Sequence, residues 1–346
     1  SALYGLFGAL GATEYSARNL IRDSILPVLI DSERFGLLRR THPDSIWGAY
    51  TLLRRYKQED GSTSDLGNRL RQVPVPAACA GDGSGRDWRQ ADECYFGRSW
   101  PGGELLETVF GPFEDSYFLV DIPELGIAVE PERDEWFQFF QWLGVHAYPR
   151  MIEAHGPIRR DAEAPFEGAA LWPQYMEAID DSFRCRHPTK GGDHRRELSA
   201  AHTLEHFDDL VEAGDAERLK SLYQLLASGW QHTYRSCTRA WQHCIHTTTG
   251  CPSDQVEDYL LYALRNASWL PAEVGSSAAV CLSPKHIWTL GETDPAAARQ
   301  LVPTLPETLR TGMYLDLAVD LAFTSSSVAQ IEDYIDLLYL FPARYG

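Results

Sequence analysis

The stretch "LRQVPVPA", residues 70–77, decides the fold because it joins a helical region to an extended one. The preceding residues, 14–58, carry apolar side chains at three- and four-residue steps, the period of an amphipathic helix. Pro74 and Pro76 cannot continue a helix, so the last helix must end before them. We therefore expect a helical bundle followed by a strand that begins at these prolines.

The residues that directly follow Leu70 lack the helical spacing of apolar side chains. Residues 73–97 hold prolines and a Gly/Asp/Ser turn at 81–87 between short extended pieces, which predicts a loose β-hairpin followed by a loop. "THPDS" at 41–45 predicts a break and a new helix start, with Asp44 or Ser45 as the cap. Further elements are expected as a short helix at 101–111, a strand at 116–122 and a helix at 131–144.

The same order of landmarks occurs twice. "LRNASWLPA" at 264–272 repeats the helix end and the proline-bounded "PA", and "LGVHAY" at 143–148 repeats "LGATEY" at 10–15. Ordered landmarks favour duplication over chance resemblance. We expect an α+β, predominantly helical fold of two tandem related units, each a helical bundle with a small β-hairpin or sheet, spanning 1–142 and 143–346. Copies of this size are domains with their own cores, not thin solenoid repeats.

The second unit is expected to carry an irregular insertion at about 149–200, interrupted by a short helix at 171–183. Amphipathic patterns beyond it predict further helices. Those helices are expected at 199–215, 216–244, 253–273, 294–306 and within 313–340, with a strand and loop at 280–291.

Bulk composition excludes some partners. The chain has 31 Lys and Arg against 49 Asp and Glu, a net charge of −18, so nucleic acid and anionic membranes are unfavourable partners. No apolar stretch is long enough to cross a bilayer, and no signal peptide is evident. Seven cysteines without a framework indicate reduced thiols and a cytoplasmic protein. Because "SA" leads directly into an apolar run, we interpret the chain as a segment of a longer protein.

The best metal candidate is "HTLEHF". On the predicted helix, His202 and His206 stand four residues apart and would project from one face, a spacing that can bind zinc. Glu205 directly precedes the second histidine, so the metalloprotease order His-Glu-x-x-His is not met. Two surface histidines at a helix start is the interpretation we favour. Further donors from the insertion would be Cys185, His187 and His194.

A second group of donors is Cys237, His243, Cys244, His246 and Cys251. Its spacings match no standard zinc finger or ribbon. Cys237, Ala240, Trp241 and Cys244 also recur at helical steps, which favours the core face of a helix with buried free cysteines over a structural metal.

Other signatures of chemistry are weak. No Gly-x-Ser-x-Gly elbow is present. "GDGSG" at 81–85 imitates a nucleotide loop in composition only, because it sits at a hairpin tip. Adjacent carboxylates such as Asp180-Asp181 and Asp208-Asp209 diverge on a helix and do not make an acid/base pair. We assign no catalytic residue, no bound metal and no cofactor.

Three phrases resemble the repeated segments of sacsin-like proteins, closest to the bacterial members: "WRQADECYFGRSWPGGELLETVFG" (88–111), "FFQWLGVHAYPR" (139–150) and "LRNASWLPAE" (264–273). Such proteins are very large chains that begin with an Hsp90-type ATPase domain and continue as repeat regions. The resemblance implies a middle or C-terminal segment that serves as a scaffold or chaperone-like arm. The ATPase motifs of that family are missing from this sequence.

Two functions therefore stay open. The first is a non-catalytic scaffold or protein-interaction (chaperone-like) segment, whose partner is another protein or another segment of the same polypeptide. The alternative is a metal-dependent hydrolase with a His-rich site in the 185–206 region.

Overall fold

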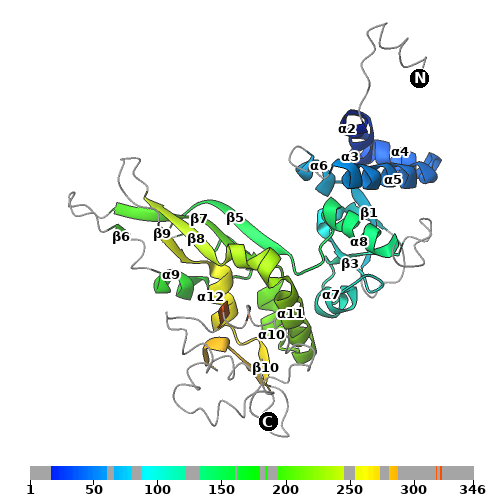
Figure 1. Cartoon of the computed structure of the whole chain (residues 1–346). Coiled ribbons are helices and arrows are strands. Elements are labelled where there is room, and N and C mark those ends of the chain that lie inside the picture. The colour runs from blue at the N-terminus through cyan, green and yellow to red at the C-terminus, as the bar shows by residue number, and fades with distance from the viewer. Residues whose placement is uncertain are drawn as a thin grey trace, which may run out of the picture. The chain divides into compact units, whose positions relative to one another are not determined.

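The computed structural model describes residues 17–60, 66–79, 87–121, 132–159, 162–179, 184–185, 194–244, 254–272, 280–286, 317 and 320–321. The fold is mixed α+β, as predicted (Figure 1). It divides into two compact units, Ser1–Ala147 and Tyr148–Gly346. None of the described helices is long and apolar enough to cross a membrane. Expectations outside the described residues concern the phrase at 10–15, the tip at 81–85, the helix at 294–306 and most of 313–340.

Helices form the N-terminal part of the first unit, as the apolar periodicity predicted. They are α2 (Ala17–Leu20), the π-helix η1 (Ile21–Ile25), α3 (Leu26–Ile30), α4 (Ser32–Thr41), α5 (Pro43–Asp60) and α6 (Gly67–Arg71). The predicted cap at Asp44 or Ser45 is wrong, because α5 begins at Pro43 and both residues lie in its first turn. Pro43 suits that place, since its missing N–H would have no helical partner there.

The predicted hairpin of the first unit belongs to a four-stranded sheet. Its strands are β1 (Pro74–Cys79), β2 (Asp87–Gln90), β3 (Cys94–Phe96) and β4 (Tyr117–Leu119), in the order β2-β1-β4-β3. Strand β1 is antiparallel to β2 and β4, whereas β3 is parallel to β4. The stretch expected to be a loop after the hairpin thus contains a short 3₁₀ helix, η2 (Ala91–Glu93), and β3.

Aromatic side chains fill the core of the first unit. Two predicted helices, α7 (Gly103–Phe110) and α8 (Glu132–Leu143), contribute Phe110, Trp136, Phe139 and Phe140. The rings of Tyr95 and Phe110 stack with centroids 4.6 Å apart, and Tyr50 lies against Phe139 and Phe140. Burying rings of this size is the largest source of apolar stabilisation available to a core.

The second unit is built on a sheet that the sequence did not predict (Figure 1). Strands β5 (Met151–Ile158), β7 (His194–Leu204), β8 (Arg239–Cys244) and β9 (Asp254–Glu257) lie in that order, and β6 (Arg184–Cys185) also pairs with β7. The 149–200 region is therefore not simply an irregular insertion. The predicted helices at 199–215, 216–244 and 253–273 are each partly wrong, because β7, β8 and β9 occupy parts of them.

The helices of the second unit are shorter than expected. They are α9 (Trp172–Ala178), α10 (Phe207–Ala213), α11 (Ala216–Gly229), the π-helix η5 (Trp230–Tyr234), the 3₁₀ helix η6 (Arg235–Cys237) and α12 (Tyr259–Asn266). A small hairpin of β10 (Leu270–Ala272) and β11 (Val280–Leu282) follows α12. Asp320 joins the unit by accepting hydrogen bonds from Trp230 Nε1 at 2.7 Å and, at its carbonyl, from Arg265.

Candidate functional site

Three segments of the second unit bring a thiol, an imidazole and a carboxylate together. His202 stands near the end of β7, Cys237 is the last residue of η6, and Asp258 is the N-cap of α12. The backbone N–H of Asp258 donates to the carbonyl of Thr238 at 2.9 Å, which holds the start of α12 next to Cys237. The cluster is thus fixed by main-chain pairing at the ends of strands β8 and β9.

Asp258 is the fixed point of the cluster. Its side chain is fully buried, and Oδ1 accepts hydrogen bonds from the backbone N–H groups of Leu260 (2.9 Å) and His202 (3.1 Å). Oδ2 lies 3.0 Å from His202 Nδ1. Burial raises the pKa of Asp258, and these hydrogen bonds to the carboxylate oppose that effect. One carboxylate therefore caps a helix and holds both the main chain and the ring of His202.

His202 carries a positive charge in this setting. Burial would lower the pKa of its imidazole, but hydrogen bonds to Asp258 and Cys237 and the charges of both overcome burial and raise the pKa from 6.5 to about 10. Glu153, paired with His202 across β5 and β7, places Oε1 at 3.4 Å from Nε2. The protonated ring therefore faces two carboxylates and one thiol.

Cys237 is the group that this arrangement activates. Its hydrogen bond to His202 lowers the pKa of the thiol more than partial burial raises it. Ser236 Oγ lies 3.6 Å from the sulfur and also favours the thiolate. A thiolate, not a thiol, is the nucleophilic form of cysteine, so the site combines a nucleophile with a proton-carrying imidazole.

The candidate metal ligands His202 and His206 do not lie on one helix. His202 lies on β7, not on a helix, and His206 adopts φ +56° as the N-cap of α10, so the two rings do not share a helix face. The backbones of Cys185 and His194 pair between β6 and β7. His187 lies outside the described residues. Within the described part of the chain, no three His, Cys, Asp or Glu side chains are grouped so that they could hold a metal.

The helix face proposed for Cys237, Ala240, Trp241 and Cys244 is also wrong. Residues 239–244 form β8, where Ala240 is buried and Trp241 is 47% exposed, the alternation of a strand. His246 and Cys251 lie outside the described residues. Sequence reasoning named His202 and Cys237 separately and missed Asp258, whose position directly before the apolar helix "YLLYALRN" is a helix N-cap signal.

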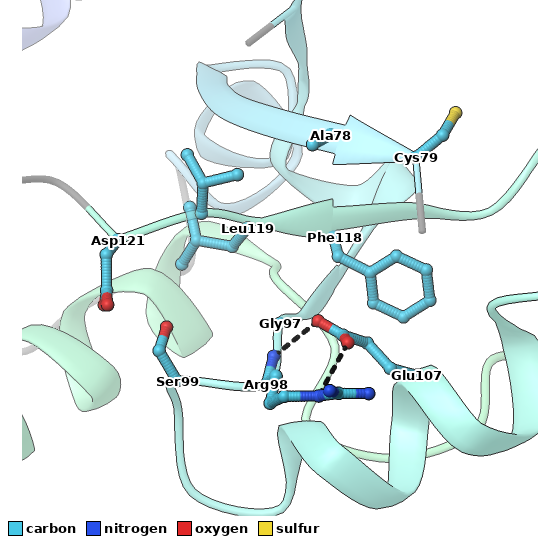
Figure 2. A pocket seen from close by; sticks show the side chains of 10 residues that line it. Ala78, Cys79, Gly97, Arg98, Ser99, Glu107, Phe118, Leu119 and Asp121 are labelled. Atoms are coloured by element: carbon cyan, nitrogen blue, oxygen red, sulfur yellow. Dashed lines mark hydrogen bonds and ion pairs between the residues drawn. The ribbon is translucent and has the colours of Figure 1, made fainter. Parts of the chain in front are cut away.

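The first unit holds a pocket of about 360 Å³ beside the ends of β3 and β4 (Figure 2). Phe118 and Leu119 form part of its wall. Glu107 accepts a hydrogen bond from the backbone N–H of Arg98 at 2.6 Å and lies 3.2 Å from its Nε. Asp121, the third charged residue of the lining, is paired with Arg133, so both carboxylates of the pocket already have partners.

The cluster predicts unequal reactivity of two cysteines in one unit. Cys237 and Cys281 are both partly exposed free thiols, but burial raises the pKa of Cys281, whereas His202 lowers that of Cys237. Iodoacetamide should therefore alkylate Cys237 faster at pH 6 to 7, as read by peptide mass spectrometry. In His202→Asn the Cys237 rate should fall toward that of Cys281. Equal rates in the unmodified chain would contradict the geometry.

No family model, curated protein or solved structure matches this chain.

Proposed function

We propose that the chain is a scaffold or protein-interaction (chaperone-like) segment of a larger, cytoplasmic, sacsin-like protein, and that its two units are related copies. The partner is another protein or another segment of the same polypeptide. The observation that carries this proposal is Trp241, a tryptophan that is 47% exposed on the sheet of the second unit.

Support for related copies comes from a helix–hairpin element that occurs in both units. In the first unit, α6 leads into β1, β2 and the helical turn η2. In the second, α12 leads into β10, β11 and a helical turn over 284–286. The proline of each "PA" occupies an antiparallel pair, Pro76 with Trp88 and Pro271 with Cys281. Shared order and shared pairing favour a common origin for this element.

Support for binding comes from the exposed side chain of Trp241. Because Leu198 pairs with Gln242, Trp241 lies beside Ser199, on the face of the sheet opposite to His202. Trp241 is 47% exposed. A large apolar ring therefore stands in solvent on the face that does not carry the cysteine cluster.

Ile152 adds a second apolar side chain to this face. It pairs with Thr203 and points to the same face as Trp241, and it is 39% exposed. Helix α12 packs against β7 and holds His202 through Asp258, so it covers the opposite face. The two exposed side chains thus lie on the face of the sheet opposite to α12, although Ala201 and Thr203 on the same face are buried.

An exposed tryptophan on a strand is a typical centre of a protein interface. Tryptophan is enriched at interface hot spots because it buries a large area at low entropic cost. The neighbouring exposed positions on β8 and β9 are polar, namely Arg239, His243 and Gln255. An apolar centre with a polar rim is the usual anatomy of such a surface.

An aggregation assay tests this proposal. The chain at equimolar ratio should reduce light scattering of insulin B chain released by dithiothreitol, because the exposed ring of Trp241 can bind an unfolded apolar segment. Trp241→Asp should remove most of the effect. Leu37→Asp, at an exposed apolar position on α4 of the first unit, is the matched control and should leave it unchanged. No suppression by the unmodified chain, or equal losses in both variants, would refute the proposal.

A further inference from the structure

We propose that Cys237, His202 and Asp258 form a nucleophilic site that accepts an acyl group from an ester whose leaving oxygen needs a proton. This activity goes beyond binding through the opposite face of the sheet and does not depend on it.

The geometry supports division of roles within the site. Asp258 is a positioning residue, because its two oxygens fix the imidazole at Nδ1 and the backbone of His202. With Nδ1 held at 3.0 Å, the ring turns Nε2 away from Asp258, toward the side of Glu153. The Glu153 contact at 3.4 Å is longer than an ordinary hydrogen bond, so it leaves Nε2 able to exchange a proton with a reacting group. Cys237 is partly exposed, and the hydrogen bond from Asp258 N to the carbonyl of the adjacent Thr238 holds it beside the cluster, so it supplies the nucleophile.

The proton-carrying imidazole favours acyl transfer over thiol–disulfide exchange. A thiolate leaving group needs no general acid, whereas an alkoxide leaving group does. A histidine held by a buried carboxylate beside a cysteine or serine is the arrangement that serves acyl transfer. The carboxylates of Glu153 and Asp258 disfavour an anionic acyl donor, so a neutral or cationic one fits best.

The reaction balances without an added oxidant or reductant. The Cys237 thiolate attacks the carbonyl carbon and forms the C–S bond, and the C–O bond breaks with its electron pair on the leaving oxygen. That oxygen takes the proton of His202. Loss of the thiolate charge removes one of the effects that raise the pKa of His202, which helps the ring release the proton. Water then attacks the thioester, gives a proton to His202, and returns the electron pair to sulfur.

Phenyl acetate provides the test on the full chain, because phenoxide is a basic leaving group that a general acid assists. We expect one acetyl group on Cys237, located by peptide mass spectrometry and removed by neutral hydroxylamine, as a thioester is. Cys237→Ser should abolish this adduct. His202→Asn, which keeps a donor near the Nδ1 position, should slow its formation by roughly 100-fold, within the range for loss of a general acid/base. Cys281→Ser is the control and should leave acetylation of Cys237 unchanged.

Two results would overturn the inference. One is acetylation of Cys237 at the same rate as Cys281 in the unmodified chain. The other is a Cys237 rate that His202→Asn does not change, which would mean that the ion pair only stabilises the fold. The alkylation rate of Cys281 in each variant reports whether the second unit is still folded, so that unfolding is not mistaken for loss of the site.

Discussion

Asp258→Ala is expected to lower the free energy of unfolding by about 3–5 kcal/mol, the cost of breaking a buried ion pair from one side. The substitution removes the acceptor of three hydrogen bonds, from Leu260 N, His202 N and His202 Nδ1. It leaves the protonated ring of His202 without its buried partner. Helix α12 also loses its N-cap, which alone costs about 1 kcal/mol. Urea unfolding at pH 7, followed by tryptophan fluorescence, measures the change.

Asp258→Asn is the matched control, because its amide oxygen can still accept from the two backbone N–H groups. It should cost less than Asp258→Ala, and the pKa of His202 should fall toward 6.5. In the unmodified chain, the stability that His202 contributes is fully present below its unfolded pKa of about 6.5 and is lost as pH rises through about 10. Asp258→Asn should flatten that pH dependence. A chain that tolerates Asp258→Ala with a loss under about 1 kcal/mol would contradict this account.

The elements of the first unit could be predicted because short-range signals determine them. Prolines at 74 and 76 end the helical region, Gly144 ends α8, and the apolar steps in 131–144 give one buried face. The cap of α5 was the exception, since Pro43 itself occupies the first helical position, ahead of the acceptors at 44 and 45.

The strands of the second unit could not be predicted from short-range sequence signals. Residues 194–204, "HRRELSAAHTL", contain leucine and alanine, which suit a helix, yet they pair with β5 on one side and β8 on the other. Strand preference depends on such neighbours more than on the residue itself, and the neighbours are at least forty residues distant in the chain. For the same reason residues 239–244, which were expected to end a helix, form strand β8.

The site shows the same division between local and long-range information. The cap role of Asp258 is visible locally, as the aspartate before "YLLYALRN". Its meeting with His202, 56 residues earlier, depends on the register of β7, β8 and β9. Cys237 and His202 were both noticed as metal donors because thiol and imidazole are common ligands. In the structure they interact with each other and with the carboxylate of Asp258 instead.

Gly103→Ala is expected to destabilise the first unit by about 3 kcal/mol, near the upper end of overpacking costs. A Cβ at Gly103 would lie 1.8 Å from the carbonyl oxygen of Gly97 and 2.4 Å from its carbon. The obstructing atoms are backbone, and the turn between the two glycines is closed by hydrogen bonds from Trp100 N to Gly97 O and from Gly103 N to Trp100 O. Neither the backbone at Gly97 nor that at Gly103 can move without opening the turn that precedes α7.

Gly48→Ala gives the opposite expectation in the same unit. Gly48 lies inside α5, and no atom comes within 4 Å of a Cβ built there. Alanine should therefore stabilise the unit by about 0.4–1 kcal/mol, because it restricts the unfolded chain at no steric cost. Thermal unfolding followed by circular dichroism compares the two variants. If Gly103→Ala unfolds at the same temperature as the unmodified chain, the turn at 97–103 is less tightly packed than in this structure.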